Sequence, residues 1–437
     1  MTARNDVRLA AEDGHEQPGR SRPPKAAVAA AMFAISLGLA LAVFQTFDRH
    51  PWSMLDLRVY VWGGALAGHS QDPYLYTYPP NLHFTYTPLA AAFFAPLGWL
   101  DLPVAIGIIT TVSVASLVGV IWLTWGAVRN WSSRDRIGAT LAVAAVALWI
   151  EPVRQTLSFG QVNLILMLVI VADLCMPDSR RWKGVGVGLA AGFKLTPLIF
   201  IPYLLLTRRF RAAAVSAATF AVTIAASAVV LPKATEHYWL DRLFLNPTRV
   251  GNVRFIGNQS LYGAILRLFG SAAAARPFQI AAVAVVGTAG LLLAAWASRR
   301  GQEMIGILVC ALTGLLVSPV SWSHHWVWVA PLLVVLADLA TRPRSLSAPR
   351  FHRWAPWLGA AAVAVLFSGL LWIVPASPAR GYAMSGFEQV IGDLYVLAGL
   401  AGLVVIAGIL AYTRPTERRP SGTNPAAASE EHLAQPS

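Results

Sequence analysis

Long apolar segments, each close to the length that crosses a lipid bilayer, recur from near one end of the chain to the other. A membrane-spanning helix needs about 20 mostly apolar residues, and in lipid a helix satisfies its own backbone hydrogen bonds. The sequence therefore predicts an all-α integral membrane protein, a bundle of about ten full spans. These expected spans lie near 26–47, 103–127, 137–152, 161–176, 211–232, 278–298, 304–320, 325–340, 355–374 and 388–412.

The composition indicates the same class of protein. Hydrophobic residues make up 56% of the chain and charged residues only 13%, whereas soluble domains carry about 25% charged residues. So few charged side chains cannot cover a surface that faces water, and we expect membrane lipid to surround the chain. The net charge of +13 does not indicate nucleic-acid binding, because the basic residues lie in the gaps between apolar segments rather than on one face.

Two further segments are apolar but irregular. Residues 88–100 are short and are interrupted by Pro88 and Pro96, which suits an interfacial or re-entrant helix. Residues 184–206 have the pattern of two half-length helices broken at 194–197. Irregular backbone at membrane depth survives only where protein or a watery cavity lines it. We therefore expect re-entrant or interfacial helices beside the full spans.

The distribution of basic residues predicts the orientation. Cytoplasmic loops carry an excess of Lys and Arg, and most of the 34 Lys and Arg residues fall in alternate gaps between the expected spans, both chain ends included. We expect a multi-pass plasma-membrane protein with both termini in the cytoplasm. Disordered ends at 1–25 and 413–437 would flank a single transmembrane domain at 26–412, whose long outer loops, 48–102 and 233–276, are expected to carry function.

The first outer loop offers an acid and several aromatic side chains. Asp56 follows the first span directly and so lies at the depth of a lipid-borne phosphate. A carboxylate can remove the proton from an attacking sugar hydroxyl, and Arg58 can contact a phosphate. Tyr60, His83 and Tyr86 suit sugar binding but equally suit the aromatic belt at a membrane interface. An ordinary interfacial Asp–Arg pair in a solvated loop is the competing interpretation.

Polar side chains also enter two apolar segments. Gln161 and Asn163 lie in the first turn of an expected span, where polar groups are costly without partners, although capping of the helix end explains them equally well. Lys194 lies at the break in 184–206, and a buried ammonium group needs an anion or a wet cavity. A lipid phosphate would satisfy it, whereas snorkelling to the interface would explain the same residue without a ligand.

The second long outer loop is dense in arginine and amides at 246–260. Lys and Arg are normally enriched in cytoplasmic loops, so arginines in an expected outer loop need another explanation. Two arginines and several amides suit a phosphate, pyrophosphate or polyol ligand. The candidate binding residues are Arg249, Arg254, Asn258 and Gln259.

The expected turn at 318–328 places His324 and His325 between Trp322 and Trp326. The histidines suit a base, a phosphate contact or a metal site, and an interfacial Trp/His belt would give the same pattern. A metal is the weakest of these interpretations, because adjacent histidines point in different directions on a helix and no third ligand type clusters nearby. The sequence therefore predicts no metal site.

Six stretches, taken in order, resemble glycosyltransferase family 87, the C-type, polyprenyl-phosphate-mannose-dependent mannosyltransferases of mycobacteria and relatives. The similarity extends over about 26–412 and rests on Asp56, Phe84-Thr85-Tyr86-Thr87-Pro88-Leu89-Ala90-Ala91, Phe159-Gly160-Gln161-Val162-Asn163, Phe193-Lys194-Leu195-Thr196-Pro197, Gly257-Asn258-Gln259-Ser260 and Ser318-Pro319-Val320-Ser321-Trp322-Ser323-His324-His325. The resemblance implies a C-type glycosyltransferase bundle with α-(1→2)-mannosyltransferase activity at the outer face of the membrane. Its partners would be polyprenyl-phosphate mannose as donor and a phosphatidylinositol mannoside or a lipomannan or lipoarabinomannan chain as acceptor.

The resemblance also implies a mechanism. The donor is β-linked, so an α product requires one inverting displacement, for which Asp56 is the catalytic candidate. The chain has Asp-Leu-Arg-Val-Tyr at this point rather than the double-acid pattern of some C-type enzymes, which makes a metal cofactor doubtful and leaves His324 or His325 as a rival base. A transporter or flippase of a lipid-linked sugar is the alternative function, although it would have no use for a base at one surface.

Overall fold

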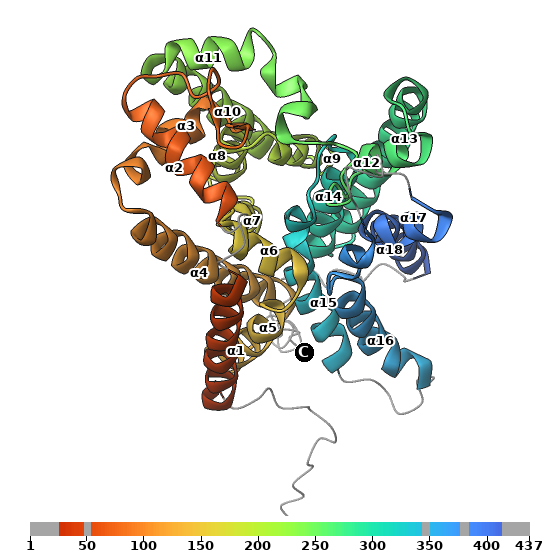
Figure 1. Cartoon of the computed structure of the whole chain (residues 1–437). Helices are drawn as coiled ribbons and strands as arrows, with labels where there is room; N and C mark the ends of the chain where they lie inside the picture. Colours follow the sequence, from red (N-terminus) through yellow and green to blue (C-terminus); the bar gives the residue numbers. More distant parts are fainter. Residues whose placement is uncertain (1–25, 48–53, 343–349, 376–383, 413–437) are drawn as a thin grey trace, which may run out of the picture.

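The computed structural model describes residues 26–47, 54–342, 350–375 and 384–412. The expected disordered ends, 1–25 and 413–437, lie outside these described residues. Helices form nearly all of the regular structure in the described part of the chain, beside one small β-hairpin (Figure 1). The prediction of an all-α membrane protein is confirmed.

The helical elements, with short 3₁₀ helices written η, are as follows in chain order: α1 (Ala26–Phe47), α2 (Leu55–Gly68), α3 (Pro88–Phe94), η1 (Ala95–Trp99), α4 (Leu102–Val128), α5 (Ser133–Ala147), α6 (Glu151–Phe159), α7 (Asn163–Leu174), α8 (Val185–Phe193), η2 (Thr196–Ile199), α9 (Phe200–Leu206), α10 (Phe210–Val230), α11 (Pro232–Trp239), η3 (Leu243–Leu245), η4 (Pro247–Val250), α12 (Leu261–Phe269), α13 (Ala272–Arg299), α14 (Glu303–Val317), η5 (Ser323–Trp328), α15 (Val329–Thr341), α16 (Arg350–Leu366), η6 (Leu370–Ile373), α17 (Gly386–Gly392) and α18 (Leu394–Tyr412). The hairpin pairs β1 (Thr77–Tyr78) antiparallel with β2 (Leu82–His83).

Seven helical segments of the described chain are long and apolar enough to cross a membrane, and the bent pair α5 and α6 makes an eighth if it forms one span. This count is lower than the about ten full spans that the sequence predicted. The expected spans 161–176 and 304–320 are α7 and α14, of 12 and 15 residues. At 1.5 Å per residue they are about 18 and 22 Å long, which is shorter than the hydrocarbon core of ~30 Å.

Polar turns explain why these spans are short. α7 begins at Asn163, two residues after Gln161, and α14 ends at Val317 directly before Ser318. A third expected span, 137–152, is broken before Glu151, where α5 and α6 meet at 77°. Hydropathy averaged over a segment does not detect such breaks, because the residues on both sides are apolar.

Both irregular segments form short helices, as predicted. Residues 88–100 fold into α3 and η1, and 184–206 fold into α8, η2 and α9 with extended backbone at Lys194 (φ −147°, ψ 131°). The Thr87 hydroxyl accepts a hydrogen bond from the Ala90 amide and caps α3. It also donates to the Gly192 carbonyl of α8. This bond ties the start of α3 to the end of α8, so Tyr86 and Lys194 are held close together.

Close backbone contacts fix the position of α2. A Cβ atom built on Gly64 would lie 2.3 Å from the Phe94 carbonyl oxygen, so α2 packs on α3 only with glycine there. Gly160 has a positive φ of 65°, and a Cβ atom there would lie 2.6 Å from Cβ of Leu57. The Gly160 contact holds the first turn of α2 against the turn between α6 and α7, and so brings Asp56 to Gln161.

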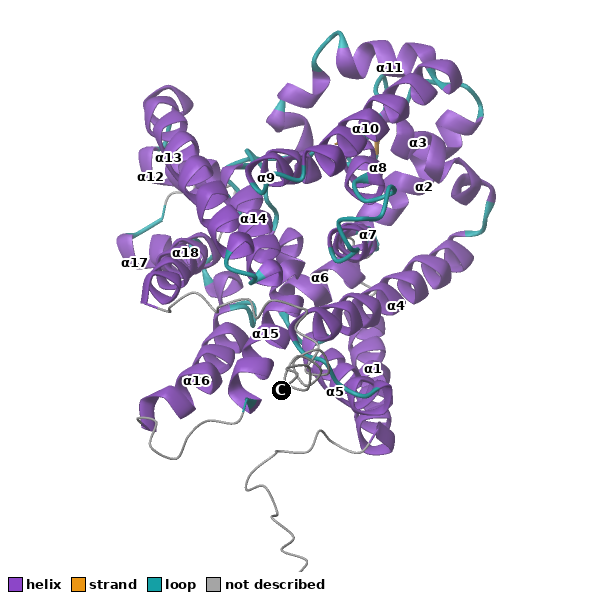
Figure 2. Cartoon of the chain, turned by 180° about the vertical axis from the view of Figure 1, so that it is seen from behind, coloured by secondary structure: helices purple, strands orange, loops and turns teal. Residues whose placement is uncertain are grey.

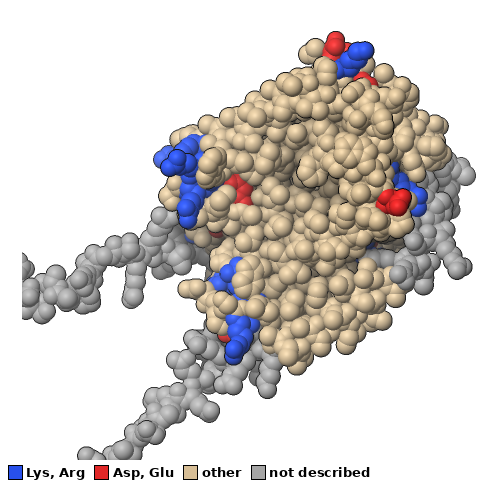
Figure 3. Space-filling model, turned by 90° about the vertical axis from the view of Figure 1, so that its left-hand side faces the viewer, with Lys and Arg blue, Asp and Glu red and all other residues tan. Residues whose placement is uncertain are grey.

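The outside of the bundle is apolar, as a lipid-facing surface must be. Exposed side chains include Val229 at 83% and Val404 at 72%, both within candidate spans. On the face shown in Figure 3, charged side chains are confined to a few spots and most of the surface is uncharged. Seen from both sides, α2 to α4 lie on one side of the molecule and α16 to α18 on the other (Figures 1 and 2).

Candidate functional site

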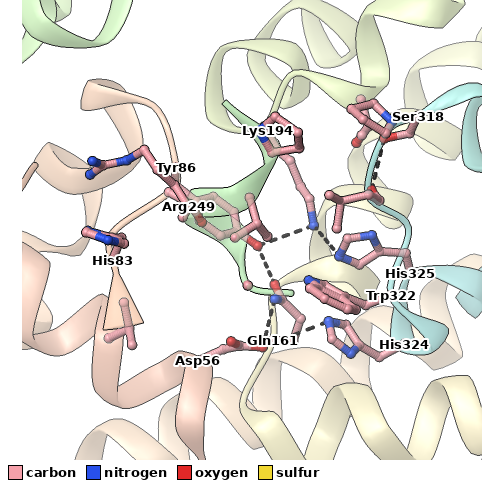
Figure 4. Close-up of a pocket in the computed structure, with 18 of the residues that line it drawn as sticks. Asp56, His83, Tyr86, Gln161, Lys194, Arg249, Ser318, Trp322, His324 and His325 are labelled. Carbon is pink, nitrogen blue, oxygen red and sulfur yellow. Dashed lines mark hydrogen bonds and ion pairs between the residues drawn. The ribbon is translucent and has the colours of Figure 1, made fainter. Parts of the chain in front are cut away.

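A cavity of about 1410 Å³ brings together segments that are far apart in the sequence (Figure 4). Its walls come from α2, the segment around the hairpin, α6, the break before η2, the 243–252 segment and the turn after α14. Ten residues that were predicted from the sequence as candidates line it: Asp56, Tyr60, His83, Tyr86, Gln161, Lys194, Arg249, Trp322, His324 and His325.

Gln161 is the centre of a hydrogen-bond network in this cavity. Its side-chain oxygen accepts from the hydroxyls of Tyr60 (2.5 Å) and Tyr86 (2.6 Å) and from the Val162 amide (2.9 Å). Because three donors surround the oxygen, the side-chain nitrogen must point the other way, and it donates to Oδ2 of Asp56 at 2.9 Å. Gln161 therefore fixes the orientation of the Asp56 carboxylate.

Lys194 forms the other end of the network. Its ammonium group donates to Tyr86 Oη (3.3 Å), Asn163 Oδ1 (3.1 Å) and His325 Nε2 (3.1 Å) (Figure 4). Since His325 Nε2 accepts from an ammonium group, the proton of a neutral His325 ring lies on Nδ1. None of the three partners is a carboxylate, so the charge of Lys194 is hydrogen-bonded but not neutralised by them. Such a cation is suited to bind an anionic ligand.

The turn that carries the histidines is attached to α6 and α7. The His324 carbonyl accepts from Thr156 Oγ1 and from Asn163 Nδ2, both at 2.9 Å. One step earlier in the chain, Ser323 Oγ donates to the buried carboxylate of Glu151 at 2.7 Å. His324 Nε2 has no hydrogen-bond partner among the residues that the structure describes, and it lies 3.9 Å from Asp56 Oδ2, which is too far for a hydrogen bond.

The environment of Asp56 adjusts its basicity. The carboxylate lies outside the candidate spans, and 27% of its side chain is exposed. Burial raises the pKa of Asp56 from 3.8 to about 6, against the opposing effects of the Lys194 charge and the Gln161 hydrogen bond. A carboxylate with this pKa is ionised at neutral pH and is a stronger base than an ordinary aspartate.

The cavity as a whole favours anions. Among the described residues that line it, Asp56 is the one carboxylate, whereas Arg154, Lys194 and Arg249 are cations. In the described part of the chain, no three His, Cys, Asp or Glu side chains gather as metal ligands would. The cavity thus places positive charge from side chains around a single carboxylate.

Six predicted candidates do not line this cavity: Arg58, Asn163, Arg254, Asn258, Gln259 and Trp326. Asn163 lies behind the wall, bonded to Lys194 and to the His324 carbonyl. Asn258 and Gln259 are fully buried and bond to backbone groups. One bond joins the Ser321 amide to Asn258, and another joins the Gln259 amide to the Ser321 carbonyl, so these two residues hold the histidine turn in place.

Two charged residues at this site were not among the predicted candidates. Arg154 of α6 lines the cavity. Glu151, one turn earlier, is fully buried and accepts hydrogen bonds from Ser323, Trp372 and Tyr395. The signal that drew attention to Arg249 was available for Arg154, since it too is an arginine next to an expected outer loop.

Several known proteins are similar in sequence to this chain over most of its length. The sequence profile of glycosyltransferase family 87 matches residues 84–319. A polyprenol-phosphate-mannose-dependent α-(1-2)-phosphatidylinositol pentamannoside mannosyltransferase of Mycobacterium tuberculosis is 34% identical over 413 residues, 91% of each chain. A polyprenol-phosphate-mannose-dependent α-(1-2)-phosphatidylinositol mannoside mannosyltransferase of Mycolicibacterium smegmatis is 35% identical over 358 residues, 76% of this chain and 77% of that one. An α-(1→3)-arabinofuranosyltransferase of Corynebacterium glutamicum is 25% identical over 335 residues, 68% of this chain and 77% of that one.

Proposed function

Because the chain belongs to glycosyltransferase family 87, we propose that it moves mannose from polyprenyl-phosphate mannose to a phosphatidylinositol mannoside in α-(1→2) linkage. Identities of 34% and 35% to proteins named for this donor and linkage support the proposal. The observation that carries it is the cavity, in which the Asp56 carboxylate and the Lys194 ammonium group are joined through Gln161 and Tyr86.

The proposed reaction is a single inverting displacement. The acceptor hydroxyl oxygen bonds to the anomeric carbon of mannose while the bond from that carbon to the phosphate oxygen breaks. The electron pair leaves with polyprenyl phosphate, and the hydroxyl proton goes to Asp56. Lys194 stabilises the negative charge on the departing phosphate. In this proposal cationic side chains neutralise the leaving group without a bound metal, and His324 or His325 is the rival base.

The pH dependence of the reaction should report the Asp56 carboxylate. Because the base acts when ionised and its pKa is raised to about 6, kcat/KM is expected to fall about tenfold per pH unit below 6 and to level off above it. The measurement is a pH profile of initial rates with purified enzyme in detergent or nanodiscs. A profile that stays flat down to pH 5, where most Asp56 would be protonated, would contradict this assignment.

The function itself is tested with defined substrates. Purified protein is incubated with polyprenyl-phosphate mannose and a phosphatidylinositol mannoside, and the product is analysed by mass spectrometry and by digestion with a linkage-specific mannosidase. We expect one added hexose that an α-(1→2)-specific enzyme removes. A transporter or flippase would move the lipid-linked sugar across liposomes and form no new glycosidic bond, so movement without a product would overturn the proposal.

We further propose that the cavity faces the outside of the plasma membrane and that both termini are cytoplasmic. The distribution of basic residues supports this orientation. Reporter fusions after Arg136, Arg181 and Tyr412 are expected to report the cytoplasm, and a fusion near Asn252 is expected to report the outside. A cytoplasmic signal from the fusion near Asn252 would reverse the orientation and place the cavity on the other face.

A further inference from the structure

Two of the three cations among the described residues that line the cavity, Lys194 and Arg249, have different surroundings. Lys194 lies beside the histidine turn, and Leu195, Ile199 and Val317 contribute an apolar wall. Arg249 and His83 lie on the other side of the cavity, away from His325 (Figure 4). Asn246, Thr248 and Asn252, close to Arg249 in the chain, contribute polar side chains to the lining, alongside Pro247, Val250 and Gly251.

Arg249 is held in position by the backbone around it. It lies in η4, which packs against β2, and its Nη2 donates to the Tyr74 carbonyl at 3.2 Å. Asp72 interacts electrostatically with Arg249, but it already accepts from the Tyr74 amide and pairs with His237. No ion pair joins Arg249 to a carboxylate within the described ranges. Its guanidinium group is therefore fixed and still able to bind an anion.

His83 is the second polar group at this end. Its Nδ1 atom is buried and has no hydrogen-bond partner in the described chain. Burial and the nearby Arg249 charge lower the pKa of His83, so the ring is neutral at pH 7. A neutral ring with an unpartnered nitrogen next to a guanidinium group is suited to hydrogen-bond a ligand that the guanidinium binds.

Exposed apolar side chains next to this region indicate that its ligand is a lipid. Leu240 is 73% exposed and Leu245 is 63% exposed, and both precede Arg249 in the same segment. Leu75, which follows Tyr74, is 66% exposed. Large exposed apolar residues beside cations are typical of a surface that meets the headgroup region of a bilayer. An anionic ligand bound beside such a surface is expected to be a lipid phosphate.

We propose that Arg249, together with His83, binds the phosphodiester of the acceptor lipid, while Lys194 binds the phosphate of the donor. This inference rests on the proposed mannosyl transfer. Both substrates are anionic lipids and must occupy the cavity at once, so two separated cations remove the repulsion between their phosphates. The reacting sugars then meet between the two ends, where Asp56 lies, and the polar side chains at 246–252 face the polyol headgroup.

The test compares an anionic acceptor with a neutral one. Arg249→Ala is expected to raise KM for a phosphatidylinositol mannoside about 10- to 100-fold, the loss typical of a hydrogen bond to a charged group. KM for an alkyl mannoside without phosphate should change less than about twofold, and so should KM for polyprenyl-phosphate mannose. Arg249→Lys should recover part of the loss. Arg254→Ala, a cation removed from the same loop but outside the cavity lining, is the matched control.

Three results would overturn the inference. An equal loss with both acceptors would show that Arg249 only supports the loop, and a rise in donor KM would assign Arg249 to the donor phosphate. Unchanged KM values for all three substrates would show that the acceptor phosphate binds elsewhere. If the unmodified protein transfers mannose to neither acceptor, the proposed function itself is wrong. The first three results instead require an active unmodified protein, so the two kinds of failure are distinguishable.

Discussion

Asp56→Asn is expected to reduce turnover by at least 10²–10⁴-fold, the range that general-base assistance typically supplies, while donor binding is retained. Asparagine has the shape of aspartate, and its oxygen can still accept from Gln161 Nε2, which lies 2.9 Å from Asp56 Oδ2. It cannot take a proton from the acceptor hydroxyl. The measurement is the single-turnover rate, together with the dissociation constant of polyprenyl phosphate.

Loss of folding would not explain such a result. The folded-state pKa of Asp56 is raised from 3.8 to about 6, so above pH 6 the folded protein carries a carboxylate that burial disfavours. Replacing it with a neutral amide removes this cost. The melting temperature of Asp56→Asn at pH 7.5 is therefore expected to equal or exceed that of the unmodified protein, and a lower value would mean that the variant is misfolded.

The histidines provide the contrasting outcome. His324 Nε2 lies 3.9 Å from Asp56 Oδ2, and His325 Nε2 accepts from Lys194. In the proposed mechanism they orient substrate, so His324→Ala and His325→Ala should lose less turnover than Asp56→Asn. If Asp56→Asn keeps near-normal turnover and either histidine variant is inactive, the base must be assigned to the histidine turn.

The sequence identified residues that line the cavity, but it did not separate them from residues that hold the cavity walls in place. Asp56, Lys194 and the histidines stood out because charged or titratable groups at the ends of apolar segments are costly without a purpose. Asn258 and Gln259 stood out for the same polarity, but the structure shows them buried and bonded to backbone groups. A sequence does not distinguish an amide that faces a ligand from one that satisfies buried backbone.

For the fold as well, the sequence predicted some features and missed others. Hydropathy predicted the helices because lipid requires apolar residues over the whole length of a span, and it predicted the break at Lys194 because a cation interrupts the pattern. It did not predict that 137–152 bends before Glu151 or that 161–176 forms a helix of only 12 residues. Those features depend on tertiary contacts with the cavity, such as the bonds of Glu151 to Ser323 and Tyr395.

Replacing Lys194 with methionine is expected to weaken binding of polyprenyl phosphate by roughly 30- to 5,000-fold. Removing one partner of a buried, hydrogen-bonded charge pair costs about 2–5 kcal/mol, and in the proposed complex the donor phosphate is that partner. Methionine keeps most of the apolar stem but loses the contact between the ammonium group and the Tyr86 ring, whose centroid lies 5.3 Å from Nζ. The measurement is a titration of purified protein with polyprenyl phosphate. Binding of this lipid does not depend on turnover, so its affinity can be measured in an inactive variant.

Arg254→Ala is the control, because this cation lies in the expected outer loop 233–276 but does not line the cavity. Arg254 was, like Lys194, a candidate phosphate-binding residue in the sequence, and we propose that Lys194 alone binds the donor phosphate. Lys194→Met should leave KM for the acceptor within about twofold, since Arg249 binds its phosphate in the inference above. Normal affinity for polyprenyl phosphate in Lys194→Met would mean that the donor phosphate is bound by Arg154 or Arg249, and that the network from Lys194 to Asp56 serves only to orient the base.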